Sequence, residues 1–278
     1  MGDDRKQAAA ALFGRAAATY DTIGPRFFSY FGQRLVEVAG IAAGCQVLDV
    51  ACGTGAVSFP AAEQVGAGGS VIGVDLAAEM VEQARHLAAA RNVSNVDFQV
   101  MDADQLDWPD ETFDAVLCGF ALFFLRDMAR TLAEFRRVLK PGGVLALSLW
   151  GRSDERWDWL FEVTGKYMAK HPPAAEPAAT PADLPDTHSV AGLCGFVANG
   201  GFAPVRVIEE DHDIFYADEA EWLAVQWSHG ARVFLEMTPE GLRDAMIAEL
   251  FTHLQRLRTP DGIPERQTVL FAVGIKPT

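Results

Sequence analysis

One turn limits what this chain can fold into more than any other stretch of its sequence. Residues 47–59 read VLDVACGTGAVSF, which is an apolar run, a turn with two glycines and the start of a helix. A glycine after a buried strand lets the backbone approach a ligand closely, and the helix that follows presents free N–H groups. The stretch therefore predicts a strand–turn–helix unit that binds a nucleotide-like ligand.

Alternating strands and helices surround this turn. Apolar strands are predicted at 46–51, 70–76, 96–102, 113–120 and 142–150. Helices are predicted at 54–66, 77–91 and 127–140, and a broken helical segment at 7–38 precedes them. This alternation is typical of a doubly wound α/β fold, in which parallel strands are joined by right-handed helical crossovers. The strands are almost entirely apolar, as expected when helices cover both faces of the sheet.

The residues of the turn exclude two common nucleotide sites. A dinucleotide site uses G-x-G-x-x-G, whereas this chain has Ser58 at the third position, after Gly53 and Gly55. The Gly-Lys-Ser/Thr ending of a phosphate-binding P-loop is also absent. Asp49 lies on the strand before the glycines, where a carboxylate would repel pyrophosphate but would suit a cationic amino group.

Two further acids follow the next strands. Asp75 ends the second strand, twenty residues after Gly55, and an acid at this spacing can accept hydrogen bonds from both ribose hydroxyls. Asp102 and Ala103 end the third strand, where a carboxylate and a backbone N–H can bind the edge of an adenine ring. A ligand with ribose, adenine and an ammonium group but no phosphate is S-adenosylmethionine.

Four stretches of the chain resemble the class I S-adenosylmethionine-dependent methyltransferases, in the branch similar to the ubiquinone/menaquinone C-methyltransferases. They are VLDVACGTG (47–55), VIGVDLAAEMVEQAR (71–85), DADQLDWPDETFDAVLCGFALFFLRD (102–127) and EFRRVLKPGGVLALSLW (134–150). The resemblance implies a Rossmann-like, mostly parallel seven-stranded sheet whose last strand is antiparallel, with N-terminal helices and a helical lid. One departure is Ala51, which stands where the family usually has the first glycine of its turn.

The resemblance also implies a set of cofactor-binding residues. Gly53 and its neighbours would hold the methionine part, Asp75 the ribose and Leu76 one face of the adenine, while Cys118 and Gly119 would lie near the sulfonium. Tyr20 resembles a tyrosine of an N-terminal helix that closes over the cofactor. The full predicted set is Tyr20, Asp49, Ala51, Cys52, Gly53, Thr54, Gly55, Asp75, Leu76, Met80, Asp102, Ala103, Asp104, Cys118, Gly119 and Phe120. No metal site is expected.

Four parts of the chain are expected. Residues 1–45 form an N-terminal helical cap, 46–150 the S-adenosylmethionine-binding core, 151–202 a lid insertion, and 203–278 the rest of the core sheet with a helical acceptor-site insertion at 218–258. Strands are predicted at 204–216 and 266–277, and helices at 218–228 and 239–258. The stretch 171–187 is rich in Pro and Ala and is expected to be a loop.

Aromatic residues decorate the predicted core and suggest a large apolar acceptor of aromatic or terpenoid type. The residues expected in its pocket are Phe27, Phe28, Tyr30, Phe124, Trp157 and Trp227. Methyl transfer is an in-line displacement that needs alignment and exclusion of water, and a base only where the acceptor must lose a proton. Tyr20 and His229 are the candidate catalytic residues. The methylated atom, O, N or C, stays open, as does pairing of the apolar N-terminal helices in a homo-oligomer.

Charge and cysteine content narrow the partners. The formal net charge is −15, which disfavours nucleic acid and anionic membranes. The longest apolar run, 113–125, is too short to span a bilayer, and no signal peptide is evident. The four cysteines form no CxxC pair and are expected to be reduced thiols. We expect a cytoplasmic enzyme whose product is S-adenosylhomocysteine.

Two other functions remain open from the sequence. A methyltransferase-fold protein can bind the cofactor and yet catalyse a cyclisation or have a non-catalytic role. A nicotinamide-dependent oxidoreductase shares the doubly wound fold, although the missing third glycine and Asp49 argue against it.

Overall fold

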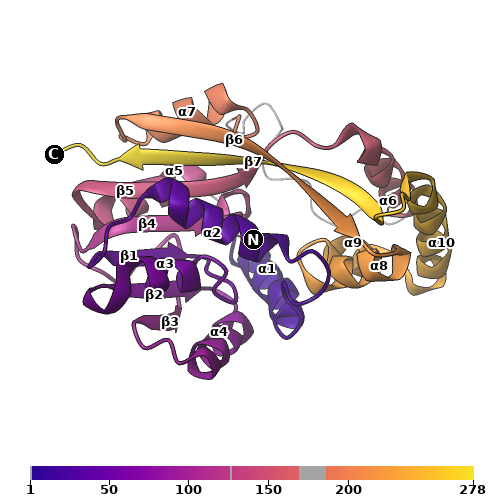
Figure 1. Ribbon diagram of the computed structural model, residues 1–278, viewed down its shortest axis with the longest axis horizontal. Helices are drawn as coiled ribbons and strands as arrows, with labels where there is room; N and C mark the ends of the chain where they lie inside the picture. Colours follow the sequence, from indigo (N-terminus) through magenta and orange to yellow (C-terminus); the bar gives the residue numbers. More distant parts are fainter. Residues whose placement is uncertain (1, 126, 169–185) are drawn as a thin grey trace.

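A seven-stranded sheet forms the centre of the molecule (Figure 1). The computed structural model describes residues 2–125, 127–168 and 186–278. The strands are β1 (Gln46–Val50), β2 (Ser70–Asp75), β3 (Val96–Val100), β4 (Phe113–Gly119), β5 (Leu139–Trp150), β6 (Val205–Tyr216) and β7 (Ile263–Ile275). Their order is β3-β2-β1-β4-β5-β7-β6; β1 to β5 run parallel, and β7 is antiparallel to both of its neighbours. The predicted Rossmann-like sheet with an antiparallel last strand is confirmed.

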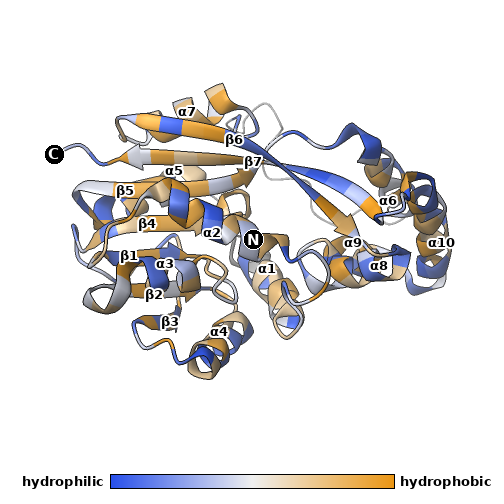
Figure 2. Ribbon diagram, in the orientation of Figure 1, coloured by the Kyte–Doolittle hydropathy of each residue, from blue (hydrophilic) through white to orange (hydrophobic). Residues whose placement is uncertain are grey.

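Helices cover both faces of this sheet. The α-helices are α1 (Gly2–Ala16), α2 (Phe27–Ala39), α3 (Ser58–Val65), α4 (Ala78–Arg91), α5 (Met128–Val138), α6 (Trp159–Met168), α7 (Val190–Asn199), α8 (Glu219–Ser228), α9 (Arg232–Met237) and α10 (Glu240–Leu257). Helices α2 and α3 contribute to one buried cluster, and α5 and α7 to another. The central strands are correspondingly hydrophobic along their length in Figure 2.

Strand β1 shows how the sequence produces this layering. Successive side chains of a strand point to opposite faces. Val47 accordingly packs in the cluster under α2 and α3, while Leu48 and Val50 pack in the cluster under α5 and α7. Asp49 shares the face of Val47 and is buried there. A buried acid on an apolar face is costly unless it has a partner, so this position points to a ligand.

Strands β6 and β7 reach beyond the rest of the sheet (Figure 1). Strand β5 pairs with β7 over residues 269–275 only, whereas β6 pairs with β7 down to Ile263. Helices α6, α8, α9 and α10 gather around this two-stranded extension, which comprises 211–216 and 263–268. Trp222, Met246 and Leu250 bury apolar side chains in the cluster that includes Ile263. The extension therefore carries a helical subassembly beside the core.

Several element boundaries differ from the sequence predictions. The helix expected at 54–66 begins only at Ser58, because Gly55 has a φ of 95° and turns the chain first. The helix expected to end at 140 ends at Val138, because Leu139 already pairs with Phe113 and begins β5. Helices α6, α7 and α9 were not expected from the sequence.

The region expected to be a lid insertion contains α6 and α7. Helix α7 packs on β6 and β7, through buried Leu193 and Val197. The Pro- and Ala-rich stretch 171–187 lies, apart from its last two residues, outside the described residues. Within the described residues, no helix is long and apolar enough to cross a membrane. All four cysteines are free thiols, as expected, and Cys52 and Cys118 are buried.

Candidate functional site

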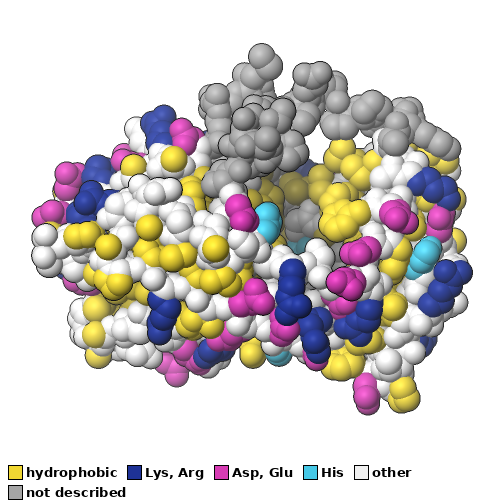
Figure 3. Space-filling model, turned by 90° about the horizontal axis from the view of Figure 1, so that it is seen from above, with side chains coloured by type: hydrophobic (Ala, Val, Ile, Leu, Met, Phe, Trp, Pro, Cys, Tyr) yellow, Lys and Arg dark blue, Asp and Glu magenta, His cyan; other side chains and the backbone are white. Residues whose placement is uncertain are grey.

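A cavity of about 660 Å³ opens where β1, β2 and β4 end. The strand order changes direction between β1 and β4, and this is the point at which open α/β sheets bind ligands. The cavity continues from this edge to the β6–β7 extension, with Tyr216 and Glu265 in its far wall. Figure 3 shows the surface hollowed between the two halves of the molecule, with hydrophobic side chains at the rim.

The glycine turn after β1 forms the floor of the near end. Gly53 lines the cavity with a φ of 53°, and Ala51 has a φ of 54°, in the left-handed region that favours glycine. Alanine is therefore accommodated where the family usually has glycine, at a cost in backbone strain. Helix α2 packs directly on this turn, since a Cβ on Gly32 would lie 2.2 Å from the carbonyl oxygen of Ala56.

Asp49 lies beneath the turn with half of its carboxylate unpaired. Its Oδ2 accepts a hydrogen bond from the Ser58 hydroxyl, while Oδ1 is buried without a partner among the described residues. Asp49, Gly53 and Ser148 line a small side cavity of about 40 Å³, which adjoins the main one at Tyr20 and Gly119. Burial raises the pKa of Asp49 to about 7. An unpaired buried carboxyl oxygen fits the ammonium group of S-adenosylmethionine.

Asp75 is held rigidly at the end of β2. Its Oδ2 accepts from the Gly53 N–H and its Oδ1 from the Ala77 N–H, each at 2.9 Å, and burial raises its pKa. Each oxygen keeps a second lone pair, and the residue lines the cavity beside Leu76 and Met80. This arrangement fits two ribose hydroxyls and an adenine ring.

Asp102 is hydrogen-bonded to Lys6, a residue that was not predicted from the sequence to lie in the site. Lys6 of α1 donates to both carboxylate oxygens of Asp102, at 2.8 and 2.7 Å, and forms an ion pair with Asp104 at 2.5 Å. Lys6, Asp102 and Ala103 all line the cavity. A single lysine in an alanine-rich helix carries no sequence signal, because its partners lie about a hundred residues away.

Some predicted cofactor residues lie behind the cavity wall rather than in it. Thr54, Gly55, Asp104 and Cys118 do not line either cavity, and Cys52 lines only the smaller one. Cys118 is buried in the sheet one residue before Gly119, so its side chain points to the opposite face. Asp104 instead accepts a hydrogen bond from the Thr131 hydroxyl, which fixes the loop after β3.

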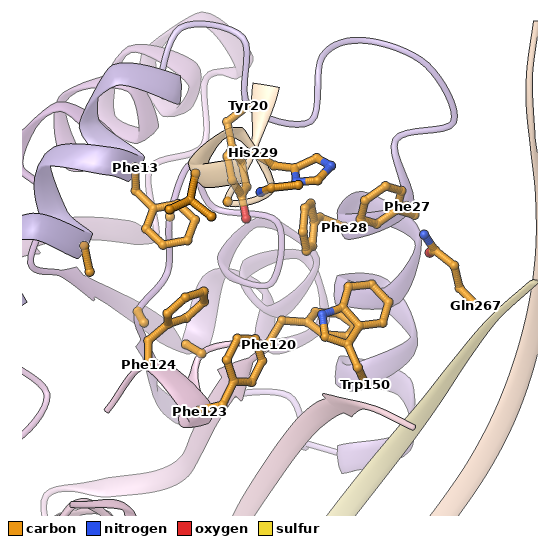
Figure 4. Close-up of a pocket in the computed structure, with 18 of the residues that line it drawn as sticks. Phe13, Tyr20, Phe27, Phe28, Phe120, Phe123, Phe124, Trp150, His229 and Gln267 are labelled. Atoms are coloured by element: carbon orange, nitrogen blue, oxygen red, sulfur yellow. The ribbon is translucent and has the colours of Figure 1, made fainter. Parts of the chain in front are cut away.

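Aromatic rings enclose the middle of the cavity (Figure 4). Tyr20 stacks on Phe28 with ring centroids 5.1 Å apart, and Phe120 lies on Trp150 at 4.2 Å. Phe120 has a φ of 55°, a strained conformation that directs its ring into the chamber. Of the predicted pocket residues, Phe27, Phe28, Phe124 and Trp157 line the cavity. Phe13, Trp150, Phe161 and Trp222 also line the cavity and are not among the pocket residues predicted from the sequence.

Two residues expected in the acceptor pocket lie outside this cavity. Tyr30 is 40% exposed and stacks on the ring of His212 with centroids 3.8 Å apart, outside the cavity. Trp227 also does not line the cavity and lies near the guanidinium groups of Arg232 and Arg243. Each lies one or two residues from a lining position of its own helix, and that offset turns its side chain to another face.

His229 projects into the chamber at the end of α8. Its Nδ1 accepts a hydrogen bond from the Ala231 N–H at 3.1 Å, and its ring lies edge-on to Phe27 and Phe28. Burial lowers its pKa to about 4, so the ring is neutral at neutral pH. With Nδ1 accepting, the neutral ring carries its proton on Nε2. His229 is therefore a hydrogen-bond donor in this geometry, which favours binding an acceptor over taking a proton from it.

Tyr20 keeps its hydroxyl proton in this environment. Burial, with a smaller contribution from Asp21, raises the pKa of its hydroxyl well above the usual value. The residue lines both cavities and stands between the turn after β1 and the aromatic chamber. Its place favours packing against ligands over proton transfer.

Known proteins are similar to this chain in sequence and in fold. Residues 47–143 match the family described as a methyltransferase domain. Nocamycin O-methyltransferase of Saccharothrix syringae is 32% identical over 95% of this chain and 96% of its own length. Aklanonic acid methyltransferase DauC of a Streptomyces species is 40% identical over 51% of this chain and 65% of its own length.

A solved structure of similar fold holds the cofactor that the site fits. The phosphoethanolamine N-methyltransferase 2 of Haemonchus contortus in complex with S-adenosyl-L-methionine has a TM-score of 0.55 and 18% identity, covering 90% of this chain and 53% of that chain. The alignment with the Saccharothrix enzyme covers nearly the whole chain, and the cavity lies at the ends of β1 to β4. Both findings support the same family. The chain belongs to the S-adenosylmethionine-dependent methyltransferases.

Proposed function

We propose that this enzyme methylates an oxygen atom of an aromatic, natural-product acid. The observation that carries the proposal is one continuous cavity, which joins an S-adenosylmethionine site at the ends of β1 and β2 to a chamber walled by aromatic rings. Its volume of about 660 Å³ suits more than one small ligand. The names of two relatives, an O-methyltransferase and a methyltransferase of an acid, support an oxygen acceptor that is acidic.

The protonation of the two candidate bases, His229 and Tyr20, also supports an acidic acceptor. His229 is a neutral donor and the Tyr20 hydroxyl is protonated at neutral pH. Neither can take a proton from an acceptor beside the aromatic rings, and Glu265 lies in the far wall of the cavity. A carboxylate needs no such base, because it arrives already ionised. Its oxygen would form a bond to the methyl carbon as the carbon–sulfur bond breaks, leaving S-adenosylhomocysteine.

The residues of the site then have separable tasks. Asp49, Asp75 and Asp102 would bind the ammonium, ribose and adenine parts of the cofactor. The Nε2–H of His229 would donate to the acceptor's acid group and hold one oxygen in line with the methyl carbon. The rings of the chamber, such as Phe28, would exclude water around the reacting atoms. The bound cofactor supplies an electrophilic methyl group.

We also place the enzyme in the cytoplasm. Its four cysteines are all free thiols, which is typical of proteins in a reducing compartment.

The first test is isothermal titration of the protein with S-adenosylmethionine and S-adenosylhomocysteine. We expect micromolar binding, weakened about 100-fold in Asp75→Ala, since two hydrogen bonds to a charged group are lost. Asp75→Asn is the matched control and should lose less, because its carbonyl oxygen still accepts. Failure of the wild-type protein to bind either ligand would refute the proposal.

The second test is a mass-spectrometric screen of polycyclic aromatic acids for the gain of one methyl group. We expect products that alkaline hydrolysis returns to the parent acid, as esters do. Cofactor binding without methylation of any acid would favour a cyclising or non-catalytic role instead.

A further inference from the structure

Two polar residues interrupt an apolar face of β7 at the far end of the cavity. Alternate residues of a strand share a face, and Ile263, Val269 and Phe271 of this face are buried in the hydrophobic cluster. Glu265 and Gln267 occupy the positions between them, on the part of β7 that extends past β5. Both line the cavity. Hydrophobic residues would pack better here if this face served only the fold.

The hydrogen bonds of Gln267 are incomplete, although its side chain is hydrogen-bonded to Glu265. Glu265 accepts a hydrogen bond, at 2.7 Å, from the hydroxyl of buried Tyr216. Gln267 is 8% exposed, and its Oε1 has no partner among the described residues. Figure 4 shows Gln267 beside Phe27 at the edge of the aromatic chamber. Buried polar groups normally have partners, so an orphan acceptor in a cavity wall points to a ligand.

The donors nearby are already committed to other groups. Arg266 binds Asp213 through two hydrogen bonds of 2.8 and 2.9 Å, and Arg156 binds Asp154. The Trp157 indole N–H donates to the Pro264 carbonyl at 3.1 Å. Among the described residues of this corner, the one buried side-chain oxygen without a partner is an acceptor, the Oε1 of Gln267. A complementary ligand therefore brings donors.

We propose that Glu265 and Gln267 form a polar anchor for the acceptor, binding a hydroxyl or amino group on its ring system at the end remote from the methylated acid. This inference rests on the proposed function, because it takes the cavity to be the acceptor site. His229 and the anchor then hold the two ends of one elongated molecule, and the rings between them pack against Phe27 and Trp150. A flat acid without the remote donor leaves Gln267 unpaired and binds more weakly.

Matched aromatic acids test the anchor. The probes are biphenyl-4-carboxylic acid with its 4′-hydroxy derivative, and 2-naphthoic acid with its 6-hydroxy derivative, titrated into protein saturated with S-adenosylhomocysteine. In the wild type we expect the hydroxy acid of at least one pair to bind about tenfold more tightly, as for one hydrogen bond to a charged or buried acceptor. Gln267→Leu and Glu265→Leu should abolish this preference. The control Glu240→Leu, at an exposed position of α10, should retain it.

A second measurement needs no acceptor. Without ligands, Gln267→Leu should raise the melting temperature by a few degrees, because it replaces an incompletely paired buried amide by an apolar side chain. A fall in melting temperature would show that Gln267 serves the fold and would overturn its role as an anchor.

The outcomes separate the two proposals. If the wild-type protein does not bind S-adenosylhomocysteine, the proposed function is refuted. Normal S-adenosylhomocysteine binding with no preference for a hydroxy acid in either pair, or with the preference intact in both variants, overturns the anchor alone.

Discussion

The two ends of the cavity are built in different ways. The cofactor end uses the turn after β1 and the ends of β2 and β4, which neighbouring parallel strands bring together. The acceptor end uses side chains from α2, β5, α8 and β7, which are far apart in the sequence. At the cofactor end, the backbone of one sheet sets the positions of the lining residues. At the acceptor end, the packing of separate helices and strands sets the positions of the lining residues.

The electrostatics of the two ends differ as well. Asp49, Asp75 and Asp102 face the cofactor end, and their carboxylates suit a cationic, hydroxyl-bearing ligand. The acceptor end is aromatic, with His229 and the polar anchor at separate points. This division teaches that one cavity can hold a fixed cofactor and an interchangeable acceptor, provided that different residues bind each. The following predictions test whether the ends are independent.

The largest expected effect is on turnover alone. His229→Leu should lower kcat about 100-fold for an acid found in the methylation screen, as removal of a buried donor does elsewhere. His229→Gln, whose amide N–H can replace Nε2–H, should recover part of the loss. S-adenosylhomocysteine affinity should not change in either variant. Steady-state kinetics measure kcat, and titration measures the affinity for S-adenosylhomocysteine. A parallel loss of this affinity would show that the two ends of the cavity are not independent.

The pH profile gives an independent check on His229. Because burial lowers its pKa to about 4, kcat should show no inflection from this residue between roughly pH 6 and 8. A general base with an ordinary histidine pKa would make kcat fall as the pH drops through about 6.5. Such a fall, absent in His229→Gln, would restore the role of base.

Glu265 should make the free protein less stable as the pH rises. Burial raises its pKa to about 7 from an ordinary value of 4.5. The folded state thus favours the protonated acid: its stabilising contribution is full below about pH 4.5 and is lost as the pH rises through about 7. Relative to Glu265→Gln, the wild-type free energy of unfolding should fall by about 3 kcal/mol over this range. Urea denaturation at several pH values measures it, and a flat difference would contradict the buried carboxyl.

A smaller effect is expected where α1 meets the cofactor end. Lys6→Met removes the ion pairs with Asp102 and Asp104 and should speed S-adenosylhomocysteine dissociation about fivefold, since partly exposed ion pairs contribute little. Lys6→Arg should stay near wild type. Stopped-flow displacement measures the rate, and added salt should narrow the difference. An unchanged rate would mean that α1 does not hold the cofactor.

The smallest effect concerns backbone strain. Ala51→Gly should raise the free energy of unfolding by up to about 1 kcal/mol, because a φ of 54° suits glycine better than alanine. Ala62→Gly, in the interior of α3, is the matched control and should lower stability instead, because glycine is a poor helix former. Thermal or urea denaturation of both variants measures the change. Equal losses in the two variants would show that Ala51 is unstrained.

Many residues that line the near end of the cavity were predictable from the sequence, for a physical reason. Apolar runs locate the parallel strands, and cavity-lining residues such as Asp75 and Gly53 lie at or shortly after their ends. Side-chain direction was less predictable, as Cys118 shows, because one residue along a strand reverses the face. The roles of Lys6 and Gln267 could not be identified from local sequence, since they arise when distant elements meet. The tautomer of His229 depends on a single backbone N–H and likewise needs the structure.

The extension of β6 and β7 has a consequence for how such an enzyme can diversify. Among the described strands, β6 is the partner of residues 263–267 of β7, so their side chains are not tied to the register of the central strands. Substitutions at Glu265 or Gln267 can accumulate while the turn after β1 stays unchanged. A gene duplicate could therefore acquire a new acceptor by drift in this two-stranded arm and still inherit methyl transfer intact.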